Sequence, residues 1–420
     1  MRSMTIDDVI RIARIYEVKV SPRGEVGYLA AWPDIEANRY RSHLTVWRPS
    51  GEEYYLEAES ISSIAWSPTG SSIAFLGRKS KDDKKGVGLY VWAGRGDPRL
   101  LVWFKHGASQ LSWPMEDRIL VLAYTEVEGD YDKDDDYVAT NSVPLWRDGE
   151  GMVAGLRRVI CSIDPGSGYL AEAASEDTDI LGYEYHKGSL YYYHAPNPLD
   201  PLKHRLVKVD ASRKEEILEG YTIGQLRSSG DNLYMLAHTR PIGISSHYRL
   251  YRIEDGEATC TSCGFKWNIA SIAGFRDSDP VVVYLHRGAS ILAQMSGAEA
   301  KPITGENEYV HAAHAKGGLA AYVLSTPTAP PEVYVDMAGS RARVTSVNQW
   351  LVREVALVEP IHFTVEAEGD VIDAWVMLPP HKELPYPAIL YIHGGPKGMY
   401  GYRFHPEMQL AASKGYAVVY

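Results

Sequence analysis

The stretch KVSPRGEVGYLA at residues 19–30 recurs as AWSPTGSSIAFL at residues 65–76, 46 residues further along the chain. In both copies, apolar runs stand on either side of a Ser-Pro-x-Gly sequence. Proline suits the second position of a β-turn, and glycine tolerates the backbone angles that close it. Each copy therefore predicts two antiparallel strands joined by a tight turn. A weaker copy, LSWPMEDRILVLAY, lies at 111–124.

A second pattern, a short apolar strand followed by a polar turn, recurs seven times. Most copies are roughly 40 to 45 residues apart, which is the period of propeller blades built from four strands each. The third unit is longer because it carries an insertion around residues 125–152. We therefore predict a mainly β chain with a seven-bladed β-propeller at residues 15–340. An array of two-sheet sandwiches is the competing interpretation, and the single sustained period favours the propeller. The seven copies are HLTVWRPSG at 43–51, GLYVWAGRG at 88–96, LRRVICSIDPGSG at 156–168, HRLVKVDASR at 204–213, YRLYRIEDG at 248–256, SILAQMSG at 290–297 and PEVYVDMAG at 331–339.

Both ends of the chain depart from this pattern. At the N-terminus, Thr5 and Asp8 form a helix-start signal before apolar residues at helical spacing, which predicts a short helix within residues 1–14. After residue 340, a strand, a loop, a helix and another strand follow a hairpin, and this order indicates the start of an α/β domain at residues 341–420. The predicted elements are a hairpin at 360–380, a buried strand in PAILYIHGGP at 387–396, a helix in HPEMQLAASKG at 405–415 and a buried strand in YAVVY at 416–420.

The glycine loop HGGP at residues 393–396 carries the clearest chemical information. In α/β-hydrolases, a backbone N–H of the loop after the third strand helps to hold the oxyanion, and HGG sequences build that loop. A plain turn with convenient glycines is the alternative. The buried strand expected before the loop and the capped helix expected after it favour an oxyanion loop.

Taken together, the chain resembles the prolyl oligopeptidase family of serine peptidases (S9), and most closely its acylaminoacyl-peptidase branch. The resemblance covers the N-terminal helix, the seven repeats and the HGGP loop. It also includes the phrases SVPLWRDGEG at 142–151 and TPTAPPEVYV at 326–335. After the HGGP loop comes a Q-x-x-A-x-x-G-Y pattern made by Gln409, Ala412, Gly415 and Tyr416.

The resemblance implies a serine peptidase whose propeller covers the active site and admits short peptides, N-acylated or free. It implies that the N-terminal helix packs on the hydrolase domain. It assigns the backbone oxyanion donor to Gly395, with Gly394 and His393 in the same loop. Other branches carry tyrosine at the position of His393. It implies no metal and no organic cofactor, and it leaves assembly into a homo-oligomer open.

The catalytic triad of that family is not in the sequence. Its nucleophile lies in a G-x-S-x-G turn, and the nearest matches, GASQL at 107–111 and GASIL at 288–292, lack the final glycine. The family order places Ser, Asp and His after the HGGP loop, so we expect the triad beyond Tyr420, a truncated hydrolase domain and an inactive chain. An esterase and a non-catalytic binding propeller are the two rival functions. Three histidines are expected to have structural roles only: His311, His314 and His405.

Composition restricts the partners and the compartment. The net charge of −11 argues against nucleic acid, which requires a basic surface. Cys260 and Cys263 have the spacing of a zinc or redox pair, but no second pair follows, and we predict two cysteines in a loop and a reducing compartment. The sequence lacks a signal peptide pattern and an apolar stretch long enough for a membrane span, which predicts a cytoplasmic protein.

The acidic run GDYDKDDDY at residues 129–137 raises the possibility of calcium. An EF-hand loop needs glycine at its sixth position and glutamate at its twelfth, where this run places Asp135 and Asn141. We therefore predict a solvated loop. A lining of the peptide access route that repels acidic peptides is the alternative.

Overall fold

The computed structural model is mainly β, with 57% of residues in strands and 6% in helices. It describes residues 1–79, 85–127, 131–133, 137–140, 143–211, 213–380, 384–395 and 397–420. The chain forms two compact units. The first unit combines Met1–Glu57 with Phe265–Tyr420, and the second unit is Ala58–Gly264.

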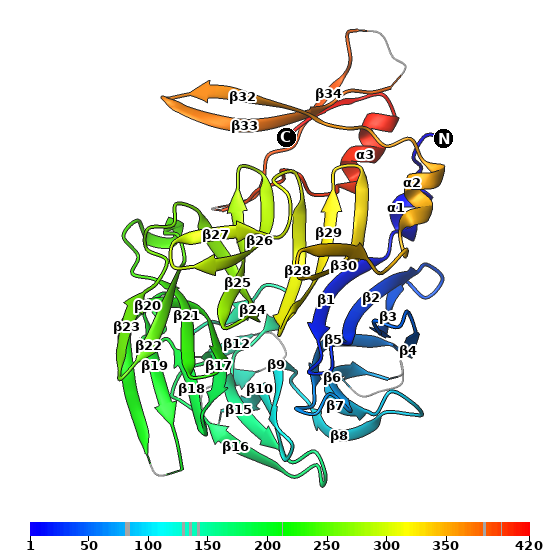
Figure 1. Cartoon of the computed structure of the whole chain (residues 1–420). Coiled ribbons are helices and arrows are strands. Elements are labelled where there is room, and N and C mark those ends of the chain that lie inside the picture. Colours follow the sequence, from blue (N-terminus) through cyan, green and yellow to red (C-terminus); the bar gives the residue numbers. More distant parts are fainter. Residues whose placement is uncertain are drawn as a thin grey trace. The chain divides into compact units, whose positions relative to one another are not determined.

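The second unit consists of consecutive antiparallel sheets (Figure 1). The first sheet contains β5 (Ser60–Trp66), β6 (Ile73–Arg78), β7 (Val87–Trp92) and β8 (Arg99–Phe104). The next contains β9 (Ala108–Met115), β10 (Arg118–Glu126), β15 (Leu156–Ile163) and β16 (Leu170–Ala174). Between β10 and β15 lie two small hairpins, which account for the expected insertion: β11 (Tyr131–Lys133) with β12 (Val138–Thr140), and β13 (Trp146–Arg147) with β14 (Gly151–Met152).

A 7-stranded sheet completes the second unit. The long strand β20 belongs to two successive groups of four strands, because its first half pairs with β19 and its second half with β21. A 3-10 turn, η1 (Gly243–Ser245), lies between β21 and β22. The strands are β17 (Ile180–His186), β18 (Ser189–His194), β19 (His204–Val209), β20 (Lys214–Ser229), β21 (Asn232–His238), β22 (Arg249–Glu254) and β23 (Glu257–Cys260).

The first unit contains a four-stranded sheet at its N-terminal end and an 8-stranded sheet. The four-stranded sheet is β1 (Arg14–Val20), β2 (Val26–Asp34), β3 (Arg39–Trp47) and β4 (Glu53–Ala58). The 8-stranded sheet contains β24 (Asn268–Arg276), β25 (Asp279–His286), β26 (Ala289–Ser296), β27 (Glu299–Pro302), β28 (Tyr309–Lys316), β29 (Leu319–Thr326), β30 (Ala329–Met337) and β31 (Ser340–Arg343).

Among the described strands, β1 is hydrogen-bonded only to β2, and side chains join β1 to the last group of strands in the first unit. Apolar residues of β1 and β2 share one buried cluster with residues of β29 and β30. Asn348 adds two polar contacts, because its side chain accepts from the N–H of Ala13 at 2.9 Å and donates to the carbonyl of Ala13 at 3.1 Å. The buried Glu332 accepts the N–H of Asn348 at 2.7 Å and thus holds Asn348 in place.

The local sequence predictions for the strands are confirmed. All seven repeated strand motifs are strands, namely β3, β7, β15, β19, β22, β26 and β30. Gly24 donates to Ser21 at 3.1 Å and Gly70 donates to Ser67 at 2.8 Å, which closes the two Ser-Pro-x-Gly turns. Both glycines have positive φ, +80° and +68°, where a Cβ would be strained. Both Ser-Pro-x-Gly sequences therefore form the tight turns that the sequence predicts.

The helices also lie where the sequence places them. In α1 (Ile6–Arg11), Thr5 and Asp8 form the expected capping box. Helix α3 (Pro406–Ser413) begins with proline and is followed by Gly415, whose φ is +102°. These two helices and α2 (Gln349–Glu354) meet in the first unit around buried Met4, Leu351 and Phe404 (Figure 1). None of the described helices is long and apolar enough to cross a membrane.

One predicted strand forms but is not buried as the sequence analysis expected. A four-stranded sheet near the C-terminus has the order β32 (Ile361–Ala367), β33 (Asp370–Met377), β35 (Ala417–Val419) and β34 (Ala388–Leu390). The hairpin and β35 agree with prediction, but β34 is not a buried strand, since Leu390 is 65% exposed. The reason is its position, because β34 is hydrogen-bonded only to β35 among the described strands.

Cys260 and Cys263, predicted to be two cysteines in a loop, form a disulfide. The prediction did not include this bond because a turn brings residues three apart in sequence within bonding distance, and the low cysteine count carries no information about such a local pair. In this disulfide form neither sulfur is a thiolate, so the pair cannot serve as zinc ligands. Cys161 is free and buried.

We expect reduction of this disulfide to lower stability only slightly. Closing a four-residue loop removes little entropy from the unfolded chain, about 2 kcal/mol at most. Urea midpoints of the oxidised and reduced protein check this expectation. The double variant C260S/C263S is the control and should show no change on addition of reductant. A loss above about 4 kcal/mol on reduction would contradict the expectation.

The acidic run falls largely outside the described residues. Asp134, Asp135 and Asp136 are among those the structure does not describe, so its predicted solvated loop stays a prediction.

Candidate active-site loop

The glycine loop leaves the sheet at the carboxyl end of β34 and is anchored on both sides. At its start, the N–H of Tyr391 donates to the carbonyl of Val419 at 2.8 Å, which extends the β34–β35 pairing by one residue. At its end, the N–H of Phe404 donates to Ser325 Oγ of β29 at 3.2 Å, and the Phe404 ring is buried. Fixed ends restrict where the tip of the loop can lie.

The tip of the loop, residues 392–395, is exposed. The His393 ring turns back on its own loop, with Nδ1 3.0 Å from the carbonyl oxygen of Gly394. Nδ1 therefore carries the proton and donates, which leaves Nε2 as an acceptor in the neutral ring. Gly398 lies against both groups, because a Cβ there would stand 2.6 Å from that oxygen and 2.8 Å from Nδ1. Glycine at 398 is thus required for the fold of the tip.

The backbone N–H of Gly395 makes no hydrogen bond with any described residue. A Cβ built at Gly394 or Gly395 meets nothing within 4 Å, so the space where a side chain would stand at either glycine is open. A free amide donor in an anchored glycine loop can bind an oxyanion, provided the reacting oxygen comes within about 3 Å. The geometry of His393 does not add a second donor toward that space through Nδ1.

The segment after the tip docks on the β25–β26 turn, a contact that the sequence did not indicate. The N–H of Tyr402 donates to the carbonyl of Gly288 at 2.9 Å. A Cβ at Gly401 would lie 2.0 Å from the same oxygen, and a Cβ at Gly288 would lie 2.5 Å from the Trp375 ring. Two glycines and a buried tryptophan therefore allow the two backbones to approach closely.

An ion pair supports the same docking contact. Arg287 donates to Asp373 of β33 through Nη2 at 2.7 Å and Nε at 3.1 Å. The hydrogen bond from Arg287 holds the pKa of Asp373 below its ordinary value, with a further contribution from His362 at 2.8 Å. Both carboxylate oxygens of Asp373 accept hydrogen bonds, so Asp373 positions the hairpin and is not a catalytic acid.

The three histidines that the sequence analysis set aside have structural partners. His311 Nε2 lies 2.7 Å from Ser325 Oγ, and burial lowers the pKa of this imidazole to about 3. His314 Nδ1 accepts a backbone N–H of β1 at 3.0 Å. His405 is buried at the start of α3, where burial lowers its pKa. Ser325 is 1% exposed, so the Ser325–His311 pair is a buried link and not a nucleophile and base.

Comparison with known proteins shows which proteins share this fold. No protein-family model matches the chain. An uncharacterized peptidase of Bacillus subtilis (strain 168), YuxL, is 24% identical to it over 464 residues, which cover 99% of this chain and 70% of that protein. The acylaminoacyl peptidase of Pyrococcus horikoshii has the same fold, with a TM-score of 0.85 and 23% identity over 98% of this chain.

The β-propeller domain of the Trilobed protease from Pyrococcus furiosus, described as having an open velcro topology, is a further structural relative. It covers 80% of this chain with a TM-score of 0.63 and 14% identity. The chain thus shares the fold of propeller-containing peptidases. The resemblance to the prolyl oligopeptidase family is confirmed. The chain spans 65% of the length of the Pyrococcus horikoshii enzyme.

Proposed function

We propose that this chain supplies the propeller and the oxyanion loop of a serine peptidase that hydrolyses short peptides, of the acylaminoacyl-peptidase or oligopeptidase type. The observation that carries the proposal is the N–H of Gly395, which bonds to no described residue and lies in a glycine loop whose two ends are anchored. An acylaminoacyl peptidase that shares this fold has been seen in complex with Z-Gly-Gly-Phe-chloromethyl ketone, which supports a peptide as the class of substrate.

In the proposed organisation, residues 1–14 form a helix that packs on the hydrolase domain, residues 15–340 form a seven-bladed propeller, and residues 341–420 begin the hydrolase domain. The contact between Ser413 Oγ of α3 and the carbonyl of Met4 at 3.3 Å supports the first part. The recurrence of four-stranded groups supports the second. The propeller would restrict access to short peptides.

An exposed apolar sheet face supports the third part. Side chains of β32 and β33 that share one face of the hairpin are largely apolar, and Ile361, Val365 and Ile372 are 54%, 44% and 51% exposed. The opposite face carries Trp375 and Met377, which are buried with residues of α3. Exposed apolar faces of this kind mark contact surfaces. We propose that the rest of an α/β-hydrolase domain covers it and provides the Ser, Asp and His.

The proposed reaction is acyl transfer to water. The serine attacks the peptide carbonyl carbon, the histidine takes the serine proton and passes it to the leaving amine, and water then releases the acyl group. The chain's own contribution is electrostatic, since the Gly395 N–H donates to the oxygen that becomes negative. A cytoplasmic location stays a prediction, and the Cys260–Cys263 disulfide argues against a strongly reducing compartment.

We expect the 420-residue chain alone to be inactive and a chimera to be active. The chimera joins residues 1–420 to the C-terminal segment of the Pyrococcus horikoshii acylaminoacyl peptidase. Hydrolysis of N-acetyl-alanyl and prolyl chromogenic peptides measures both proteins, and exchange of the chimera's serine nucleophile for alanine is the control. Peptide hydrolysis by the purified chain, or a folded chimera without activity, would refute the proposal.

A further inference from the structure

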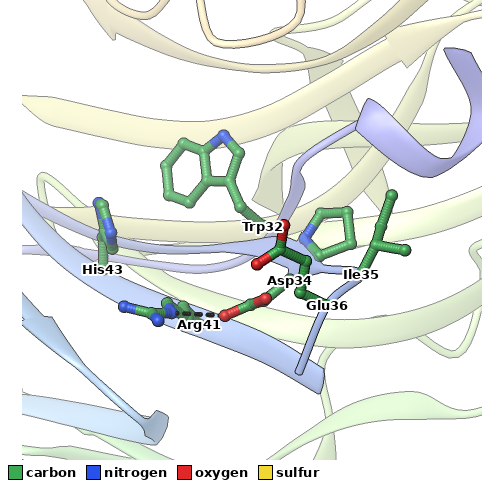
Figure 2. A pocket seen from close by; sticks show the side chains of 7 residues that line it. Trp32, Asp34, Ile35, Glu36, Arg41 and His43 are labelled. Atoms are coloured by element: carbon green, nitrogen blue, oxygen red, sulfur yellow. Dashed lines mark hydrogen bonds and ion pairs between the residues drawn. The ribbon is translucent and has the colours of Figure 1, made fainter. Parts of the chain in front are cut away.

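Two adjoining hollows in the first unit surround Trp32, and the proposed catalysis uses neither. One has a volume of about 510 Å³ and the other about 340 Å³, and both are lined by Trp32, Pro33 and Ile35. Figure 2 shows the first, between the end of β2 and the neighbouring strand β3. We call the two hollows together the Trp32 crevice. The remaining lining residues are Asp34, Glu36, Arg41 and His43 in one hollow and Ile10, Arg11, Val347 and Trp350 in the other.

The floor of the Trp32 crevice is apolar and well supported. Trp32 packs on the buried cluster of β1, β2, β29 and β30. The His43 ring lies 4.6 Å from the Trp32 ring and is stacked at 5.7 Å on Tyr55. Burial lowers the pKa of His43, so the ring is neutral at neutral pH and extends the aromatic wall. Ile35 at the rim is 66% exposed.

The charges at the crevice are distributed unevenly. In the larger hollow, Arg41 is neutralised by Asp34 at 2.9 Å and by Glu57 at 3.1 Å, and Glu36 is exposed at the rim. In the smaller hollow, Arg11 forms no ion pair with any described residue, and its guanidinium lies 4.0 Å from the centroid of the Trp350 ring. A guanidinium stacked on an indole keeps its charge and its outward donors.

We propose that the Trp32 crevice binds a peptide segment that places an aromatic side chain against Trp32 and an adjacent carboxylate against Arg11. The aromatic floor provides area for a ring, and offset or edge contacts between rings add to the burial. The unpaired cation selects an acidic neighbour and disfavours a basic one. The site is outside the oxyanion loop, so it does not depend on the proposed peptidase activity.

Capped dipeptides test the proposed recognition directly. Ac-Phe-Asp-NH2, Ac-Phe-Lys-NH2 and Ac-Ala-Asp-NH2 are titrated into the 420-residue chain by calorimetry. We expect Ac-Phe-Asp-NH2 to bind at least about 10-fold more tightly than either of the other two, which corresponds to about 1.4 kcal/mol. Equal affinity for the three dipeptides, or no binding of any of them, would overturn the proposal.

Variants then separate the two parts of the site. Trp32→Ala should weaken binding of Ac-Phe-Asp-NH2 at least about 10-fold. Arg11→Gln should remove the preference for Asp over Lys, and this exposed residue can be changed without risk to the fold.

Arg14→Gln is the matched control. The Arg14 guanidinium also lies over a ring, 4.5 Å from the centroid of Tyr40. Because Arg14 pairs with Ala31, and side chains alternate along a strand, it lies on the opposite face of β2 from Trp32. We expect no change in binding for this variant. An equal loss for Arg14→Gln and Arg11→Gln, or a dimer in sedimentation that Trp32→Ala abolishes while dipeptides fail to bind, would overturn the proposal.

Discussion

Proline in place of Gly395 is expected to lower kcat/KM of the chimera by about 10²–10³, whereas alanine at the same position should leave it within a few-fold. Proline has no N–H, so it removes the proposed donor. Alanine keeps the N–H, and its Cβ would meet nothing within 4 Å. The pair of variants therefore differs chiefly in one hydrogen-bond donor.

Separate measurement of kcat and KM, with the N-acetyl-alanyl and the prolyl chromogenic peptides as substrates, makes this test specific. The loss should appear in kcat, because the donor bonds the oxygen most strongly when it is negative, and KM should change little. Circular dichroism and the urea midpoint show whether the loop substitution disturbs the fold. If proline and alanine at 395 reduce activity equally, or if proline raises KM alone, Gly395 is not the oxyanion donor.

The oxyanion loop could be proposed from sequence because its information is local. His393, Gly394 and Gly395 are consecutive, and the helix signals that follow are read from residues close by. The contact of Gly401 with Gly288 could not be predicted, because it joins residues more than a hundred positions apart and neither glycine stands in a recognisable motif. The exposure of β34 was missed for the same reason, since burial depends on what covers a strand and not on its own apolar pattern.

The strands were predictable because alternation and turn chemistry act over a few residues. Ser21 illustrates this point, since its hydroxyl accepts the N–H of Arg23 at 3.1 Å and of Glu25 at 3.0 Å and so defines its own turn. The division into sheets was less predictable. Strand β20 continues without a break from one group of strands into the next, although Gly220, whose φ is +97°, lies at the junction and would be expected to end a strand.

Trp375→Ala is expected to lower the free energy of unfolding by about 3–5 kcal/mol, the usual cost of removing a buried large aromatic side chain. Trp375 is 4% exposed and is stacked on Tyr420 with ring centroids 5.9 Å apart, and it contacts Tyr402 edge to face at 5.4 Å. It also fills the space in front of Gly288. Its loss leaves a cavity where the β25–β26 turn and the C-terminal sheet meet.

Trp375→Phe should cost clearly less than alanine. The indole Nε1 is buried and has no hydrogen-bond partner among the described residues, so phenylalanine loses area without losing a hydrogen bond. Val371 lies on the same strand and is 64% exposed, and Val371→Ala should change stability by no more than about 0.5 kcal/mol. Urea unfolding measures the three variants.

Hydrogen exchange of individual amides shows which parts of the chain Trp375→Ala destabilises. The Tyr402 amide, which donates to the carbonyl of Gly288, should exchange faster in this variant. Amides of β21 should keep their protection because they belong to the second compact unit, whereas Trp375 belongs to the first. If the Tyr402 amide stays protected while stability falls, the tryptophan supports the hairpin alone and does not hold the docking contact. The close approach of Gly288 and Gly401 would then depend on the Arg287–Asp373 ion pair instead.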